Sequence, residues 1–117
     1  MDTPRELEWY LRDHFFKQAG KGRPQLARSA IAGEMVSVYL RYRDYDPQEL
    51  GRLISPVIDN LVSNRVLLQD EDAITTSSAL FRMQCATCYY VSYLVDAEAR
   101  ACQRCAGTNL HEFPKKK

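Results

Sequence analysis

The sequence contains the segment Cys85-Ala86-Thr87-Cys88 and, after residues 89–101, the segment Cys102-Gln103-Arg104-Cys105. Each C-x2-C motif can form a tight turn that points both sulfur atoms to one side. Two such turns at the ends of a hairpin close a tetrahedral site of four thiolates. The two motifs hold all four cysteines of the chain. The spacing therefore predicts one metal site formed by Cys85, Cys88, Cys102 and Cys105.

The identity of the ion follows from the ligand set. Four thiolates fill the coordination sphere of a structural Zn2+ ion, which makes zinc the expected cofactor. Paired C-x2-C turns also suit a single iron ion, as in rubredoxin-like electron-transfer proteins. Redox-active thiols or disulfides are a further interpretation, and catalytic zinc is the least favoured because no coordination position stays open. The sequence thus predicts structural zinc, with iron as the alternative.

The residues around the cysteines predict a small β-module. Residues 89–95 are β-branched and aromatic, as expected for a strand. We expect a turn at residues 96–99, a return at residues 100–101 and a third strand within residues 108–113. Gly107 follows the second motif, where a permissive backbone helps the turn to close. Because so short a segment buries little apolar surface, metal binding is expected to supply most of its folding free energy.

This pattern resembles the zinc-ribbon family at all four ligand positions, over residues 81–113. The resemblance implies a small β-fold around a structural zinc ion, and it implies no particular activity. One departure from the family pattern is Ala106, where many ribbons have glycine directly after the last cysteine. We expect this alanine to alter the turn and to leave the metal site intact.

The N-terminal part of the chain predicts helices. The segment Thr3-Pro4-Arg5-Glu6 offers a hydroxyl cap, a proline at the first helical position and a glutamate three residues after the cap. An apolar stripe at helical spacing follows, formed by Leu7, Tyr10, Leu11, His14 and Phe15. His14 is therefore expected to be a satisfied core histidine. Glycines in residues 20–24 end this helix, and a second helix is predicted from about Pro24 to Tyr42.

The middle of the chain predicts two further helices and a hairpin. The segment Asp46-Pro47-Gln48-Glu49 is another helix-start signature. Pro56 interrupts the apolar periodicity, and proline removes a backbone donor and clashes with the preceding turn. We therefore expect a short helix at 47–54, a tight turn and a second helix at about 56–64. Residues 66–76 predict two strands joined by an acidic turn.

Helix, short helix, turn, helix and β-hairpin is the element order of a winged helix, and residues 49–74 resemble the second and third helices and the wing of such domains. The expected fold class is α+β: a winged-helix-like helical domain at residues 1–80, followed by a small β zinc ribbon at residues 81–113. Another small helical bundle is the alternative for the first domain. The connection between the domains is short, so we expect them to be docked. Residues 114–117 predict a basic disordered tail.

Composition and charge restrict the class of protein. The chain has 117 residues, of which 45% are hydrophobic and 10% aromatic, which is sufficient for a packed core. Its formal net charge is +1, whereas a dedicated non-specific nucleic-acid binder usually has a clear basic excess. No apolar run approaches the roughly 18 residues of a membrane span, and the N-terminus lacks a signal-peptide pattern. We expect a cytoplasmic protein without membrane association.

No catalytic arrangement is recognisable in the sequence. There is no phosphate-binding glycine loop and no serine, histidine and acid set at a known spacing. His111 follows Cys105 by six residues, and we expect it to be a surface histidine on a strand, because four thiolates already complete the site. The sequence thus predicts neither an enzyme nor a small-molecule substrate.

Candidate partner contacts combine basic and aromatic side chains, which can hold phosphates and stack bases. They are Lys21 and Arg23 of the basic loop, Arg41 and Arg43 between tyrosines, Asn64 and Arg65 at the end of the last predicted helix, and Tyr89, Tyr90 and Tyr93 of the ribbon, expected to be exposed. For Arg41 and Arg43, a solvated helix face with buried tyrosines is the favoured interpretation. The tyrosines of the ribbon can also pack against the helical domain.

A winged helix followed by a zinc ribbon resembles the arrangement in the archaeal transcription factor E family, including the alpha subunit of its eukaryotic counterpart. The ribbon residues that carry this resemblance are Cys85, Cys88, Tyr90, Tyr93, Ala97, Cys102, Cys105 and Leu110. The usual form of that factor is longer and has a connecting segment that this chain lacks.

The resemblance implies a non-enzymatic adaptor that assembles on a transcription or other nucleic-acid complex. A protein partner such as a polymerase is favoured over bare DNA, because the predicted wing carries Asp70, Glu71 and Asp72, which repel phosphates. Direct nucleic-acid binding is a further expectation to test. The alternatives are a protein-interaction or assembly factor unrelated to nucleic acid and, second, a rubredoxin-like redox protein.

Overall fold

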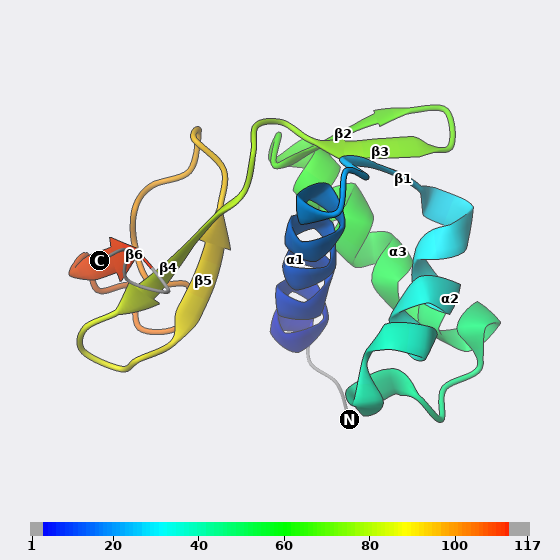
Figure 1. The fold of residues 1–117 in the computed structure, drawn as a ribbon, viewed down its shortest axis with the longest axis horizontal. Coiled ribbons are helices and arrows are strands. Elements are labelled where there is room, and N and C mark those ends of the chain that lie inside the picture. The colour runs from blue at the N-terminus through cyan, green and yellow to red at the C-terminus, as the bar shows by residue number, and fades with distance from the viewer. Residues whose placement is uncertain (1–3, 113–117) are drawn as a thin grey trace.

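The computed structural model describes residues 4–112, which form helices and two small antiparallel sheets (Figure 1). The elements are α1 (Pro4–Gly20), β1 (Gln25–Ala27), α2 (Arg28–Val38), the short 3-10 helix η1 (Leu40–Tyr42), α3 (Pro47–Ser63), β2 (Leu67–Asp70), β3 (Ala73–Thr76), β4 (Phe81–Cys85), β5 (Val91–Leu94) and β6 (Leu110–Glu112). The fold class is therefore α+β, as predicted. The predicted cap at Thr3 and the predicted tail at 114–117 lie outside the described residues.

The first sheet has the strand order β1-β3-β2. The hairpin of β2 and β3 pairs Leu67 with Thr76, which confirms the hairpin predicted within residues 66–76. The outer strand β1 pairs antiparallel with β3, with Leu26 opposite Ile74. Strand β1 therefore ties the segment before α2 to the hairpin that follows α3.

The second helix is shorter than predicted at both ends. The expected span of Pro24 to Tyr42 instead contains β1, then α2, then a break at Tyr39, whose backbone is extended with φ −104° and ψ 124°. The break turns the Tyr39 ring into the core, where it is 8% exposed and its hydroxyl donates to Asp13 at 2.7 Å. The prediction failed because sheet pairing and this buried hydrogen bond, both long-range contacts, override local helix propensity.

The third helix runs through Pro56 without interruption, so the predicted pair of helices at 47–54 and 56–64 is wrong. A proline inside a helix costs about 3 kcal/mol through the lost donor and the clash with the preceding turn. The buried face of α3 opposes this cost, since each fully buried aliphatic side chain contributes about 1.5–3 kcal/mol. That face consists of Leu50, Ile54, Val57, Ile58 and Leu61.

One hydrophobic core joins the three helices and the first sheet. Its most completely buried large side chains in this region are Leu11, Leu26, Ile31, Met35, Tyr42, Leu50, Ile54, Ile58, Leu61 and Ile74. His14 is fully buried, as expected, with Nε2 at 2.8 Å from Glu34 Oε1, but its buried Nδ1 has no hydrogen-bond partner among the described residues, so the histidine is satisfied at one nitrogen only. Leu80 and the buried Val95 also pack on this core. The core therefore includes residues from both sides of the expected domain boundary at residue 80, and that boundary stays a prediction.

The second sheet has β4 at its centre, in the order β5-β4-β6. Strands β5 and β6 lie within the predicted segments 89–95 and 108–113, but residues 100–101 form no strand. The partner of β5 is β4, a strand that we did not predict. The inward-facing Met83 and Cys85 explain why this segment forms the central strand.

Helix α1 connects the second sheet to the helical part. Trp9 Nε1 donates to the carbonyl of Val91 at 2.7 Å, and Arg12 Nη1 donates to the carbonyl of Tyr93 at 2.6 Å. The Arg12 guanidinium also forms a two-pronged pair with the Glu98 carboxylate at 2.7 and 2.9 Å. These contacts fit the expectation that the two parts are docked. Across residues 4–112, no helix has the length and apolarity needed to cross a membrane.

Asp13 is the buried acid at the centre of this junction. Its side chain is 2% exposed and accepts hydrogen bonds from the hydroxyls of Tyr39 and Tyr93. Lys17 Nζ lies 2.9 Å from Asp13 Oδ2 and compensates the carboxylate charge. Burial and the bond to Asp13 raise the pKa of both Tyr39 and Tyr93 well above the ordinary value.

An alkaline titration tests this junction. A raised pKa in the folded state means that the contribution of each phenol to stability is complete below its unfolded pKa of about 10 and is lost as the pH rises above it. We predict that Tyr39 and Tyr93 ionise only together with unfolding. Phenolate absorbance and circular dichroism, followed in parallel, measure both events. In the variant Tyr93→Phe, the rise in phenolate absorbance that accompanies unfolding should be smaller than in the parent chain by the contribution of one tyrosine. Ionisation of all tyrosines before unfolding would contradict the prediction.

Candidate metal centre

Four cysteine sulfurs lie together at one end of the second sheet, where β4 ends at Cys85 and β6 begins at Leu110. All four Sγ atoms are within 4.8 Å of one another. Cys85 Sγ is 3.6 Å from Cys105 Sγ, and Cys88 Sγ is 3.5 Å from Cys102 Sγ. A tetrahedral ion with metal–sulfur bonds of about 2.3 Å requires sulfur separations of about 3.8 Å. The donor set is therefore suited to one tetrahedral metal ion, as the spacing predicted.

The two C-x2-C turns have the same backbone hydrogen bonds. In the first turn the N–H of Tyr89 donates to the carbonyl of Cys85 at 2.9 Å, and the N–H of Cys85 donates to the carbonyl of Tyr90 at 3.0 Å. In the second turn the N–H of Ala106 donates to the carbonyl of Cys102 at 2.9 Å. The site is thus built from two copies of one local structure.

The residue after each motif has a left-handed backbone, with φ 63° at Tyr89 and 62° at Ala106. Side chains are disfavoured there by about 1–2 kcal/mol, which explains why glycine suits this position. Gly107 is needed for a different reason from the one predicted. Its φ is not left-handed, but an added Cβ would lie 3.3 Å from Cys105 Sγ and 3.8 Å from Cys85 Sγ. Gly107 therefore leaves space for the sulfurs.

Backbone N–H groups aimed at the sulfurs favour thiolates. The N–H groups of Cys88 and Thr87 lower the pKa of the Cys85 thiol to about 6. Burial raises the pKa of the Cys102 thiol, but the N–H groups of Cys105 and Arg104 outweigh it and lower that pKa. Since metals bind the thiolate form, these donors prepare the site for a cation.

Cys88 behaves differently within the same cluster. The N–H of Tyr90 lowers the pKa of the Cys88 thiol, but burial and the neighbouring sulfurs of Cys102, Cys105 and Cys85 raise it to about 12. Adjacent thiolates repel one another, so a cation is the group that can hold all four in the ionised form.

Other metal ligands are not required. The four cysteines are the group of metal-binding side chains found among residues 4–112. His111 lies on β6 opposite Gln84 and is half-buried. With four sulfurs available, the centre has the composition of a structural site and leaves no position for a substrate.

The basic candidates for partner contact lie at opposite ends of α1. Exposed Lys21 and Arg23 follow the end of this helix, and Arg23 pairs with Glu34 at 3.1 Å. Arg41 pairs with Glu6 in the first turn of α1 at 2.7 Å. A helix of 17 residues is about 25 Å long, so these two groups do not form one surface.

The remaining candidates are also dispersed. Arg43 is exposed after η1, and Asn64 and Arg65 are exposed at the end of α3. Arg65 has a left-handed φ of 61°, which ends the helix. Their role as contacts stays a prediction.

The three tyrosines of the second sheet differ in exposure. Tyr89 is 70% exposed and Tyr90 is half-buried, but Tyr93 is 2% exposed. The expectation of an exposed Tyr93 is wrong, because its ring packs against Trp9 and Phe16 of α1 and its hydroxyl bonds to Asp13. Tyr93 therefore holds the two parts of the chain together.

Comparison of the chain with protein-family models, with curated protein sequences and with solved structures gave no match. The arguments about function therefore rest on this chain's own residues and geometry.

Metal content is the direct test of the centre. We predict one bound metal ion per chain, measured by elemental analysis of protein purified without added metal. Zinc gives a colourless protein, whereas iron bound by four thiolates absorbs visible light. Cys88→Ser should lose the ion, because its hydroxyl replaces a thiolate. His111→Ala, the matched control, should retain it. A chain that contains no metal, or that loses metal with His111→Ala, would contradict the assignment.

A glycine substitution tests the strain in the second turn. Ala106→Gly should stabilise the metal-bound protein by about 0.5–1 kcal/mol. Glycine adopts the left-handed backbone without the Cβ penalty. Part of this gain is offset because glycine has more conformational entropy in the unfolded chain. Chemical denaturation of the metal-bound form measures the change. Ala97→Gly is the control, since Ala97 is exposed and does not have positive φ. Equal destabilisation by both substitutions would exclude the explanation.

Proposed function

We propose that this protein is a non-enzymatic adaptor, composed of a winged helix and a structural zinc ribbon, that assembles on a transcription complex or other nucleic-acid machine. The observation that carries the proposal is the combination of element order, sheet order and a docked four-cysteine module in one short chain.

The element order supports the winged-helix part of the proposal. Helix, strand, two helices and a hairpin follow one another as α1, β1, α2, α3, β2 and β3, and the first strand pairs with the last in the order β1-β3-β2. In this assignment α2 and α3 are the second and third helices. The recognition helix is then α3, and β2 and β3 form the wing.

The surface of α3 favours a protein partner over duplex DNA. Its exposed side chains include Leu53 and Pro56, which offer apolar contact, and Arg52 is the single cation within the helix. Asp59, also on this helix, is paired with Arg28 at 2.8 Å. A helix that enters the major groove needs donors for bases and cations for phosphates. The α3 surface is better suited to contact with a protein.

The wing supports the same choice of partner. Asp70, Glu71 and Asp72 are exposed at the β2–β3 turn, and Asp72 bonds to Ser29 at 2.6 Å. The unpaired acids repel phosphates, so a wing of this charge is poor at holding a nucleic-acid backbone. An adaptor that reaches nucleic acid through a protein such as a polymerase fits these charges.

Two alternatives remain open to experiment. The exposed apolar residues of α3 would serve a protein-assembly factor unrelated to nucleic acid equally well. A rubredoxin-like redox protein would use the same paired turns to hold iron. Metal analysis distinguishes a rubredoxin-like redox protein, which would contain iron, from the proposed adaptor. The composition of the assembled complex distinguishes an assembly factor unrelated to nucleic acid.

The proposed function predicts an assembly that depends on protein contacts. The tagged chain, expressed in its own host, should co-purify with a nucleic-acid-processing complex before and after nuclease treatment. The purified chain alone should show no measurable duplex DNA binding at physiological salt. Tight DNA binding with a steep salt dependence would indicate a direct DNA-binding protein instead. Complexes without any nucleic-acid machinery would favour the unrelated assembly factor.

A further inference from the structure

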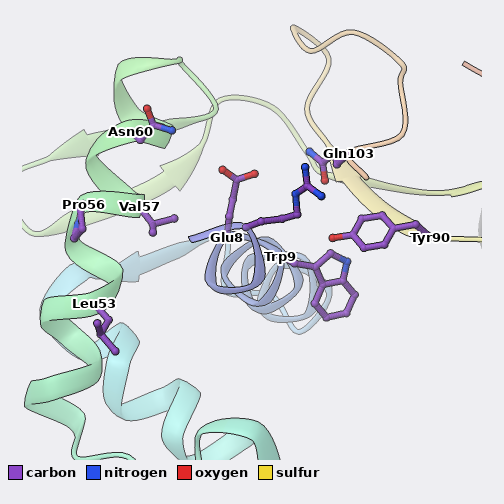
Figure 2. A pocket seen from close by; sticks show the side chains of 9 residues that line it. Glu8, Trp9, Leu53, Pro56, Val57, Asn60, Tyr90 and Gln103 are labelled. Atoms are coloured by element: carbon purple, nitrogen blue, oxygen red, sulfur yellow. The ribbon is translucent and has the colours of Figure 1, made fainter. Parts of the chain in front are cut away.

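A groove lies between α3, α1 and the metal module (Figure 2). Leu53, Pro56 and Val57 of α3 form one apolar wall, Trp9 projects from α1, and Tyr90 faces them from the module that carries the cysteines. The cavity volume is about 420 Å3, within the usual range for a bound ligand. A mostly apolar hollow of this volume is a candidate for contact with another molecule.

A second hollow of about 260 Å3 extends the groove along α1. The two hollows share Arg5, Trp9 and Tyr90, and Arg104 lines the second one. The combined groove is therefore apolar beside α3, and beside the metal module it has Arg5 and Arg104 together with Glu6, whose carboxylate is already paired with Arg41 at 2.7 Å. Such a surface can receive a chain segment that is apolar in one place and acidic in the next.

The positive charges of the groove belong to two arginine side chains. Within the described part of the chain, neither the Arg5 nor the Arg104 side chain has an acidic partner. The acid on the groove floor, Glu8, already contacts Arg12 Nε at 3.4 Å. Guanidinium groups form strong paired hydrogen bonds with carboxylates. Charge complementarity thus favours an acidic occupant.

The rim also offers polar groups without partners. The Tyr90 hydroxyl and the side-chain amides of Asn60 and Gln103 make no hydrogen bond within residues 4–112. Figure 2 shows Asn60 on the α3 side and Gln103 on the opposite side, next to Tyr90. Polar groups around an apolar centre are the usual arrangement of a protein–protein contact.

A peptide fits this groove better than a nucleic-acid strand. Single-stranded nucleic acid requires aromatic faces for its bases and a basic path for its phosphates. Trp9, Tyr10 and Tyr90 offer aromatic faces, but the α3 wall is aliphatic, and Glu6 and Glu8 interrupt the basic path that successive phosphates need, which costs binding free energy. An aliphatic or aromatic side chain of a partner protein has no such cost in the apolar hollow.

We propose that the groove binds an acidic segment of a partner protein, with a bulky apolar side chain in the hollow beside α3 and a carboxylate on Arg5 and Arg104. This inference rests on the proposed adaptor function and names its partner class. Because Tyr90 and Gln103 belong to the metal module, the groove is complete only when that module is folded. Binding is therefore coupled to the occupied metal centre.

Trp9 provides the readout. It is the single tryptophan of the chain and lies in the groove, so its fluorescence reports occupancy directly. The probe is a short peptide rich in glutamate with a central leucine-phenylalanine pair, titrated into the metal-loaded full chain. Saturable binding with a Kd below about 1 mM is expected. A peptide with lysine for each glutamate, and one with serine for the leucine and phenylalanine, should each bind at least about tenfold more weakly.

Variants assign the binding to the groove. Arg5→Glu with Arg104→Glu should weaken the acidic peptide by at least about tenfold, whereas Lys21→Glu with Arg43→Glu, which changes the net charge equally, should not. Leu53→Glu should abolish binding, and Leu68→Glu, at an exposed leucine of the wing, is its matched control. Arg104 lies between two metal ligands, so the metal content of each variant is measured. Arg5→Glu alone gives the test if Arg104→Glu loses metal.

Specific results would overturn the inference. Equal binding of the lysine peptide, or unchanged binding to Leu53→Glu, excludes an acidic segment in this groove. Binding of oligothymidine that depends on Arg5 but not on Leu53 assigns the groove to nucleic acid instead. If the parent chain binds no peptide and the Leu53→Glu variant still assembles on its complex, the groove is not the binding site. The proposed adaptor function is then unaffected. If the chain binds the peptide but does not co-purify with a nucleic-acid complex, the groove is supported as a binding site and the adaptor function is rejected.

Discussion

The Asp13 carboxylate is buried in α1 and accepts hydrogen bonds from two tyrosine hydroxyls, Tyr39 at the end of α2 and Tyr93 on β5. A buried carboxylate without such partners would be strongly unfavourable, so the three groups hold one another in place. The break after α2 and the position of β5 both follow from this contact. Arg12, one residue earlier, adds the paired bonds to Glu98. Helix α1 thus determines how the helical part and the metal module sit together.

The metal centre has a consequence beyond its own module. The turn that places Cys85 and Cys88 also presents Tyr90 at the groove, and the second motif contributes Gln103 and Arg104 directly. The same backbone therefore positions the sulfurs and the groove wall. The fold around the four cysteines in this way governs a surface that the sulfur atoms themselves do not line. This relation explains why a small protein would keep two modules tightly docked.

Sequence patterns predicted those features that depend on local chemistry, and missed those that depend on distant contacts. The hairpin of β2 and β3 and the four-cysteine cluster are local patterns and were found. Strand β1 and the continuous α3 through Pro56 depend on pairing with β3 and on a buried helix face, which local propensity does not report. A signal for docking was present on α1, where Trp9 and Phe16 share a face outside the main apolar stripe. Two such residues, seven apart, indicate a second buried contact.

By itself the sequence determined which four side chains form the cluster suited to a metal ion, since two C-x2-C motifs at the ends of a hairpin bring four sulfurs together. It also determined the α+β class, through helix-start signatures, apolar periodicity and a hairpin with an acidic turn. Only the tertiary structure decided that Tyr93 is buried, and that Arg5, Trp9, Leu53 and Arg104 meet around one groove. The three segments that carry these residues are far apart in the chain, and their proximity depends on the packing of α1 against both α3 and β5. The shared face of Trp9 and Phe16 indicates that α1 has a second contact but not which segment makes it, because that choice results from the summed free energy of the whole core.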